Sequence, residues 1–261
     1  MTQLADTAES GTEEVPRLPP PSRGYRLMHG IGWTLIWLGA LTMGFVVHQL
    51  WMTTFFAKQN QAELIVDLEE RFGSAEIIEI PYIPVTPPTD SPPPDDPPIA
   101  SGALGNLGVL RAEAPPEEGA AFAEIRIPSL ASLQDGWAVV EGVSLDDLKN
   151  GAGHMPWTPL PGQPGNSVIS GHRTTYGQPF HDLDLVEFGD LIEVKTALGT
   201  HTYAVREIHV VNPTELWVTH PRSGAWLTLT TCNPKFSAKE RLIVAAELVE
   251  GPNAEVILGR L

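Results

Sequence analysis

The only cysteine of the chain, Cys232, is the side chain best suited to covalent chemistry. It ends the strand-forming run "AWLTLTTC", and Arg241 begins a second such run, "RLIVAAELV", after an eight-residue loop. If the two runs pair as an antiparallel hairpin with Cys232 opposite Arg241, both side chains leave the sheet on one face, with Cβ atoms ~4.5–5.5 Å apart. A thiolate nucleophile and a guanidinium would then share one pocket. The arginine could stabilise either the thiolate or the oxyanion of a tetrahedral intermediate.

A cysteine nucleophile needs a base within reach, and the chain holds eight histidines. His172 is the best candidate. It follows the apolar run "NSVISG" and precedes the turn-forming "RTTYG", which would expose the ring at a strand end. His29 and His48 flank or lie in a long apolar segment. The other five carry no further chemical signal and are expected to be structural or solvated: His154, His181, His201, His209 and His220.

Each of these residues also has an ordinary interpretation. A free cysteine is often a small buried side chain without reactivity. An arginine at the start of a strand is often solvated, and a histidine is more often structural than catalytic. Residue type and spacing therefore leave both interpretations open.

The composition excludes several classes of function. The 261 residues carry a formal net charge of −16, whereas binding to a nucleic-acid backbone needs clustered Lys and Arg. One cysteine cannot form an internal disulfide. The single cysteine and scattered histidines do not have the spacing of zinc ligands, so we expect neither a metal nor another cofactor.

An apolar segment near the N-terminus predicts a membrane anchor. From Gly30 to Leu50 there is no Asp, Glu, Lys or Arg, and a helix needs ~20 mostly apolar residues to cross a bilayer. Arg23 and Arg26 precede this segment, so the positive-inside rule places the N-terminus in the cytoplasm and the rest outside, as a single-pass protein of the cell membrane. A cleaved signal peptide is the alternative, but the segment is long for one and no A-x-A-like site follows closely.

The region after the anchor is predicted to be a linker. Residues 57–72 have the pattern of a short amphipathic helix of unknown role, and residues 81–98 hold nine prolines in eighteen positions. Polyproline II extends ~3.1 Å per residue, so this acidic piece would reach roughly 55 Å as a semi-rigid stalk.

The rest of the chain is predicted to be a mostly β domain. Short strand-type runs such as "AEIRIPSL", "WAVVEGV", "DLIEVKTA" and "HTYAVREIHVV" alternate with turn-rich loops, which is typical of a sandwich or barrel. The expected organisation is a disordered cytoplasmic tail (1–29), a transmembrane anchor (30–56), a helix with a Pro-rich linker (57–120), the folded domain (121–250) and a short C-terminal tail (251–261).

Three segments, in order, resemble the signature regions of sortases, the cysteine transpeptidases of Gram-positive cell surfaces: "GHRTTYGQPF", "TLTTC" and "NPKFSAKERLIV". The T-L-x-T-C motif of that family matches Thr228 to Cys232, its histidine matches His172, and its strand arginine matches Arg241. The resemblance covers residues 122–250. The segment "GAGHMPWTPLPGQPGNSVISGHRTTYG" is similar to the actinobacterial class E branch in particular.

The resemblance implies a closed eight-stranded β-barrel with short helices, behind one transmembrane helix and the Pro-rich stalk. It implies a groove for an extended sorting peptide of the L-P-x-T-G or L-A-x-T-G type. Cys232 would attack the Thr carbonyl and form a thioacyl enzyme. An amine of a peptidoglycan precursor would resolve it, linking a surface protein to the cell wall without a cofactor.

The resemblance also implies roles for individual residues. His172 would act as general acid for the leaving glycine amine and then as base for the incoming amine. Arg241 would hold the peptide and stabilise the oxyanion, with help from the backbone or hydroxyl of Thr231. Thr230 is assigned to substrate binding as well. Tyr176 would either read the second motif position or pack over the groove.

Three other functions fit the sequence less well. L,D-transpeptidases follow an S-x-G-C-x-R pattern, whereas "NPKF" follows Cys232 here. Pilus-polymerising sortases usually carry an Asp-Pro-aromatic lid and often a C-terminal membrane span. Here Pro98 follows Asp96 and Pro97, and "EGPNAEVILGRL" is too short to span. A non-catalytic wall-binding module would be expected to have lost Cys232, His172 or Arg241.

Overall fold

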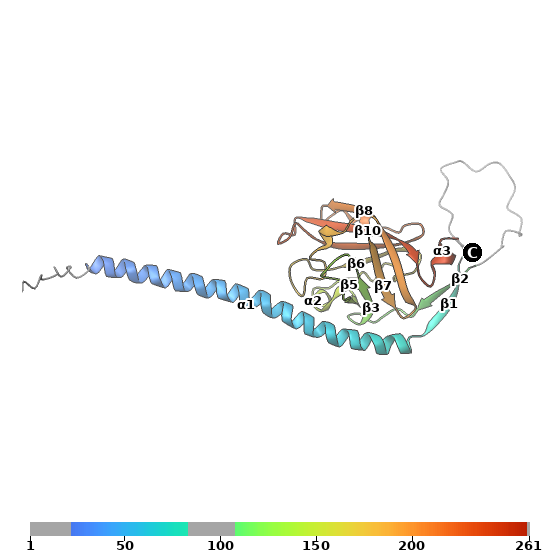
Figure 1. Cartoon of the computed structure of the whole chain (residues 1–261), viewed down its shortest axis with the longest axis horizontal. Helices are drawn as coiled ribbons and strands as arrows, with labels where there is room; N and C mark the ends of the chain where they lie inside the picture. The colour runs from blue at the N-terminus through green and yellow to red at the C-terminus, as the bar shows by residue number, and fades with distance from the viewer. Residues whose placement is uncertain (1–21, 83–107, 260–261) are drawn as a thin grey trace, which may run out of the picture. The chain divides into compact units, whose positions relative to one another are not determined.

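The computed structural model describes residues 22–82 and 108–259, in two compact units, Met1–Gln49 and Leu50–Leu261 (Figure 1). The expected disordered tail falls mostly outside the described residues. So do most of the Pro-rich segment and the Asp-Pro-Pro sequence at 96–98.

A single helix, α1 (Arg23–Ser74), joins the predicted anchor to the predicted amphipathic helix without a break. Its part Arg23–His48 has a mean hydropathy of 1.7 over a window of 18 residues with at most two charges. By length and composition, this part is able to cross a membrane.

Eight strands close into a barrel in the order β10-β8-β7-β3-β4-β5-β6-β9, which confirms the mostly β expectation (Figure 1). Neighbouring strands are antiparallel except for the pairs β4–β5 and β6–β9, which are parallel. The strands are β3 (Ala121–Arg126), β4 (Trp137–Glu141), β5 (Ala152–His154), β6 (Gly165–Ser170), β7 (Leu191–Thr196), β8 (Gly199–Val211), β9 (Ala225–Asn233) and β10 (Glu240–Glu250). The short helical pieces are α2 (Asp147–Asn150), η1 (Leu183–Leu185), η2 (Leu216–Thr219) and α3 (Ala254–Ile257).

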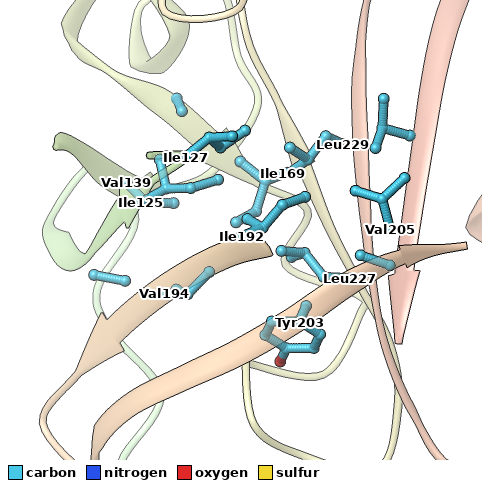
Figure 2. Close-up of a cluster of buried hydrophobic side chains, with 14 of the residues drawn as sticks. Ile125, Ile127, Val139, Ile169, Ile192, Val194, Tyr203, Val205, Leu227 and Leu229 are labelled. Carbon is cyan, nitrogen blue, oxygen red and sulfur yellow. The ribbon is translucent and has the colours of Figure 1, made fainter. Parts of the chain in front are cut away.

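The two-residue period of the strands fixes which side chains fill the barrel. In β9, Leu227 and Leu229 point into the core, and in β10 Leu242 and Val244 do the same. Figure 2 shows the two β9 leucines together with Ile125, Ile169, Ile192 and Val205, which come from four other strands of the barrel. The alternate residues of β9 and β10 therefore lie on the outer face of the barrel.

The second part of α1 packs on the barrel. Leu68 is 1% exposed and forms a cluster with Ala121, Ala138 and Val140. Gln61 extends this contact with polar atoms, because its side chain accepts a hydrogen bond from Ala138 N at 2.7 Å and donates one to Asn150 O at 2.6 Å. The amphipathic pattern of residues 57–72 thus serves to cover one side of the barrel.

A two-stranded antiparallel sheet lies in the region expected to be linker. It pairs β1 (Ile77–Tyr82) with β2 (Gly108–Glu113), and Tyr82 is the register partner of Gly108. The ends of the intervening Pro-rich segment are therefore held side by side. The reach calculated for an extended stalk does not apply, because the chain leaves and returns at one place.

The expected C-terminal tail also contains structure. Ala254 and Ile257 of α3 belong to the hydrophobic core, and Asn253 is fully buried. The Asn253 side chain accepts a hydrogen bond from Arg111 N and donates to Arg111 O and Gly162 O, so it ties the small sheet to the barrel.

Candidate active site

Cys232 and Arg241 are register partners in the β9–β10 ladder, which confirms the pairing inferred from the length of the loop between them. Leu229 and Leu242 point into the core on the same strands. By strand alternation, Cys232 and Arg241 leave the barrel together on its outer face.

The strand β6 brings His172 to the same place. It runs parallel to β9 with Ser170 paired to Thr230, and two further hydrogen bonds extend this contact past the end of the strand. Gly171 N donates to Thr230 O at 3.1 Å, and the Thr231 hydroxyl donates to Gly171 O at 2.7 Å. The residue before His172 is thus held beside Thr230 and Thr231, the two residues that precede Cys232.

The environment of the His172 ring favours its neutral form. Burial of the half-buried ring disfavours its charged form and lowers the pKa of His172 below its ordinary value of 6.5. The Tyr176 ring lies against it, with ring centroids 5.1 Å apart and planes tilted by 40°. The uncharged imidazole is thus the resting form from which a proton transfer with the thiol would start.

The turn after His172 has a constrained backbone. Tyr176, Gly177 and Gln178 all have positive φ angles, and Gln178 N donates to Thr175 O at 2.9 Å. A Cβ atom at Gly177 would lie 2.6 Å from the Trp137 ring, so only glycine fits there. This turn holds Tyr176 over His172.

Arg241 is anchored by one nitrogen. Its Nη1 donates to Ala238 O at 3.0 Å and to Glu240 O at 2.9 Å. Within the described parts of the chain, no hydrogen bond joins the side chains of Cys232, His172 and Arg241 to one another.

The two threonines assigned to substrate binding lie on opposite faces of β9. Thr230 is half-buried and shares the outer face with Cys232. Thr231 is 3% exposed and uses its hydroxyl proton for Gly171 O. A role for Thr231 at an oxyanion is therefore left to its backbone.

The loop between β8 and β9 lies along the outer face that leads to Cys232. The Asn166 side chain of β6 fixes it by donating to Val218 O at 3.0 Å and to His220 O at 3.1 Å. Trp217 of η2 is 47% exposed and contacts the His209 ring edge to face, with centroids 5.4 Å apart.

Trp217 and His209 were not predictable as neighbours of the site from residue type and spacing. His209 was expected to be structural or solvated, yet it lies on β8 two residues before Val211, the register partner of Arg241. The apolar residues of "ELWVTH" in a turn-rich loop were the only available signal.

The other histidines lie elsewhere or contact backbone. His154 is buried and its Nδ1 lies 2.8 Å from Glu141 Oε2. His201 is fully buried in β8. His181 Nδ1 lies 2.9 Å from Arg173 O. In residues 22–82 and 108–259, no group of three His, Cys, Asp or Glu side chains is placed to hold a metal ion.

The comparisons with known proteins agree with the resemblance. The sortase domain family matches residues 125–249, which include all three candidate catalytic residues. Sortase SrtE1 of Streptomyces coelicolor is 26% identical over 90% of this chain and 60% of its own length. Sortase SrtE2 of the same organism is 27% identical over 95% of this chain and 92% of its own length. The chain thus spans about three fifths of the first relative and nearly all of the second.

A solved structure, sortase E from Streptomyces avermitilis, is 36% identical in sequence, covering 51% of this chain and 91% of that one, with a TM-score of 0.47. Residues 125–249 are thus a sortase domain, and the resemblance of the chain to class E sortases is confirmed.

Proposed function

We propose that this protein is a membrane-anchored transpeptidase that cleaves a sorting signal of the L-A-x-T-G or L-P-x-T-G type between Thr and Gly. It would then join the new Thr carbonyl to an amine of a peptidoglycan precursor. The observation that supports the proposal is that β9 and β10 pair Cys232 with Arg241, while the hydrogen bonds of Gly171 to Thr230 and Thr231 bring the residue before His172 to the same end of β9.

The first half of the reaction uses the neutral His172 ring. It takes the thiol proton of Cys232, and the thiolate attacks the Thr carbonyl carbon. The resulting imidazolium gives its proton to the glycine nitrogen as the C–N bond breaks. The products are a thioester on Cys232 and a free peptide amine.

The second half reverses the proton flow. The incoming amine loses a proton to His172 as it attacks the thioester carbonyl. The C–S bond breaks, and the imidazolium returns its proton to the Cys232 sulfur. Atoms and charge balance without a cofactor.

Arg241 would stabilise the oxyanion in both halves. A guanidinium has five N–H donors, and the two backbone contacts of Arg241 use only Nη1. The donors on Nε and Nη2 are then free to meet the peptide carbonyl oxygen. A planar fork suits this task better than a point charge.

The groove for the peptide would follow the outer face of β9 from Thr230 toward η2. The exposed Leu216 and Trp217 side chains offer an apolar wall for the leucine of the motif. Tyr176, stacked near His172, would lie beside the second motif position.

The location follows from the anchor. Arg23 and Arg26 at the start of α1 favour a cytoplasmic N-terminus, which would place the barrel outside the membrane. Exported proteins and wall precursors are both available there.

The test is a peptide assay with the full chain in detergent micelles. L-A-x-T-G and L-P-x-T-G peptides would be supplied with and without a glycine amide, and masses would be recorded. We expect an adduct on Cys232 that lacks the C-terminal fragment and that the amine resolves into a ligated product. Absence of any adduct with both peptides from a folded protein would refute the proposed specificity.

A further inference from the structure

The sequence neighbours of the three candidate catalytic residues are joined by a chain of polar contacts. Arg173 follows His172, Asn233 follows Cys232, and Glu240 precedes Arg241. Arg173 Nη1 donates to Asn233 Oδ1 at 2.7 Å, and Asn233 Nδ2 donates to Glu240 Oε2 at 2.9 Å. We call these three residues the polar chain.

The polar chain begins at a buried charge. Arg173 is 3% exposed, which is unusual for a residue in a turn-forming sequence. Its Nη2 lies 3.0 Å from Asp184 Oδ1, its Nε donates to His181 O at 3.4 Å, and its Nη1 also donates to Cys232 O at 3.2 Å. A buried guanidinium is stable only when it is paired and hydrogen-bonded in this way.

Asp184 is held in the charged form that Arg173 needs. Burial favours its neutral acid, but the charge of Arg173, a backbone hydrogen bond and the charge of Lys235 together outweigh this and lower the pKa of Asp184 below its ordinary value. Because Asp184 is ionised at neutral pH, the Arg173 end of the polar chain is fixed.

The position of His172 depends on contacts of this kind. The strand β6 ends at Ser170, so the ladder with β9 does not reach His172. The Arg173 side chain crosses from the residue after His172 to the backbone carbonyl of Cys232 itself. Asn233 and Glu240 are register partners in β9 and β10, so the contact then continues to the strand that carries Arg241.

We propose that Arg173, Asn233 and Glu240 are positioning residues that fix His172 and Arg241 relative to Cys232. This inference rests on the proposed function, since it concerns the same three side chains. Because the contacts of the polar chain act in series, loss of any one of them should disrupt the positioning. Loss of Asn233 or Glu240 should therefore misplace the catalytic groups without removing them, and the two losses should not add.

The test uses variants that break the polar chain while the ion pair between Arg173 and Asp184 is kept. Glu240→Ala and Asn233→Ala each remove one link, and the double variant removes both. Glu240→Gln keeps an oxygen that accepts from Asn233. Glu247→Ala is the matched control, because Glu247 lies on the same strand and pairs with Arg206 at 3.2 Å, away from the polar chain.

The expected kinetic result is a fall in kcat of about 10- to 100-fold for each single alanine variant, with KM within about twofold of the parent. The double variant should be no slower than the slower single one. Glu240→Gln should recover most of the lost rate, and Glu247→Ala should lose none. The proposal is overturned if both single variants turn over within about twofold of the parent, or if their losses multiply.

A second readout does not depend on the sorting peptide. The rate of Cys232 alkylation by iodoacetamide would be measured against pH in the parent, in Glu240→Ala and in His172→Ala. If positioning is correct, the Glu240→Ala profile departs from the parent profile toward that of His172→Ala. Superimposable parent and Glu240→Ala profiles would overturn the proposal. This holds even if the protein cleaves none of the peptides, so the two failures are separable.

Discussion

Gln61 is expected to contribute more to stability than any other polar residue on the barrel-facing side of its helix. Its side chain bridges β4 and the entry to β5. The parallel β4–β5 ladder begins at Val139 and Ala152, one residue beyond Ala138 and two residues beyond Asn150, so the Gln61 amide takes the place of a missing backbone link. The substitution to test is Gln61→Ala.

The size of the effect follows from the two groups left behind. The N–H of the fully buried Ala138 loses its acceptor, which costs about 1–3 kcal/mol. The carbonyl of Asn150, an exposed residue, can bind water, so its loss costs about 0.5–1.5 kcal/mol. Together the free energy of unfolding should fall by about 2–4 kcal/mol, which lowers Tm by roughly 5–15 °C for a domain of this size.

The assay is thermal unfolding of the full chain in detergent, followed by tryptophan fluorescence. Gln59→Ala is the matched control, since Gln59 is the same residue type on the same helix but is exposed. It should change stability by no more than about 0.5 kcal/mol. Equal Tm values for the two variants would refute the reasoning that α1 supplies a structural link to the barrel.

Three further outcomes are expected. Cys232→Ala should abolish the peptide adduct while Tm stays within about 2 °C of the parent, and cleavage by this variant would show that the nucleophile is a different residue. Arg241→Lys should lower kcat/KM by about 100-fold, because an ammonium cannot reproduce the fork of donors; turnover near the parent rate in the peptide assay would exclude the oxyanion role. Burial lowers the pKa of His201 to about 4, whereas the unfolded value is 6.5. The unfolded state therefore takes up the proton first, and stability is complete above pH 6.5 and falls toward pH 4 by up to about 3 kcal/mol. The dependence of Tm on pH between these values should be weaker in His201→Gln. An unchanged dependence would contradict the assignment.

The pairing of Cys232 with Arg241 was predictable because it depends on local information. Two strand-type runs separated by a short loop favour an antiparallel hairpin, and the two-residue period then decides which side chains share a face. His172 was identified from its place at a strand end, although the parallel neighbour that brings it to Cys232 is 60 residues away in sequence.

The polar chain was not predictable in the same way. Arg173 lies in a turn-forming stretch where an arginine is usually solvated, and only the tertiary contacts with Asp184 and Asn233 explain its burial. The strand β1 was missed because it contains Pro81 and precedes a Pro-rich segment, both of which argue against a sheet. A proline is tolerated in β1 because β1 is an edge strand of a two-stranded sheet. That edge position depends on long-range pairing, which the local sequence does not show.

The pairing of Tyr82 with Gly108 has a consequence for how this chain can vary. Both ends of the intervening segment stay paired in one ladder. Residues added to or removed from this segment should therefore leave the packing of α1 on the barrel and the access to Cys232 unchanged. A protease cut within the segment would likewise leave the two fragments bound to each other. The segment is therefore a suitable insertion site. A reporter domain or affinity tag could be placed there without changing the geometry of Cys232, His172 and Arg241.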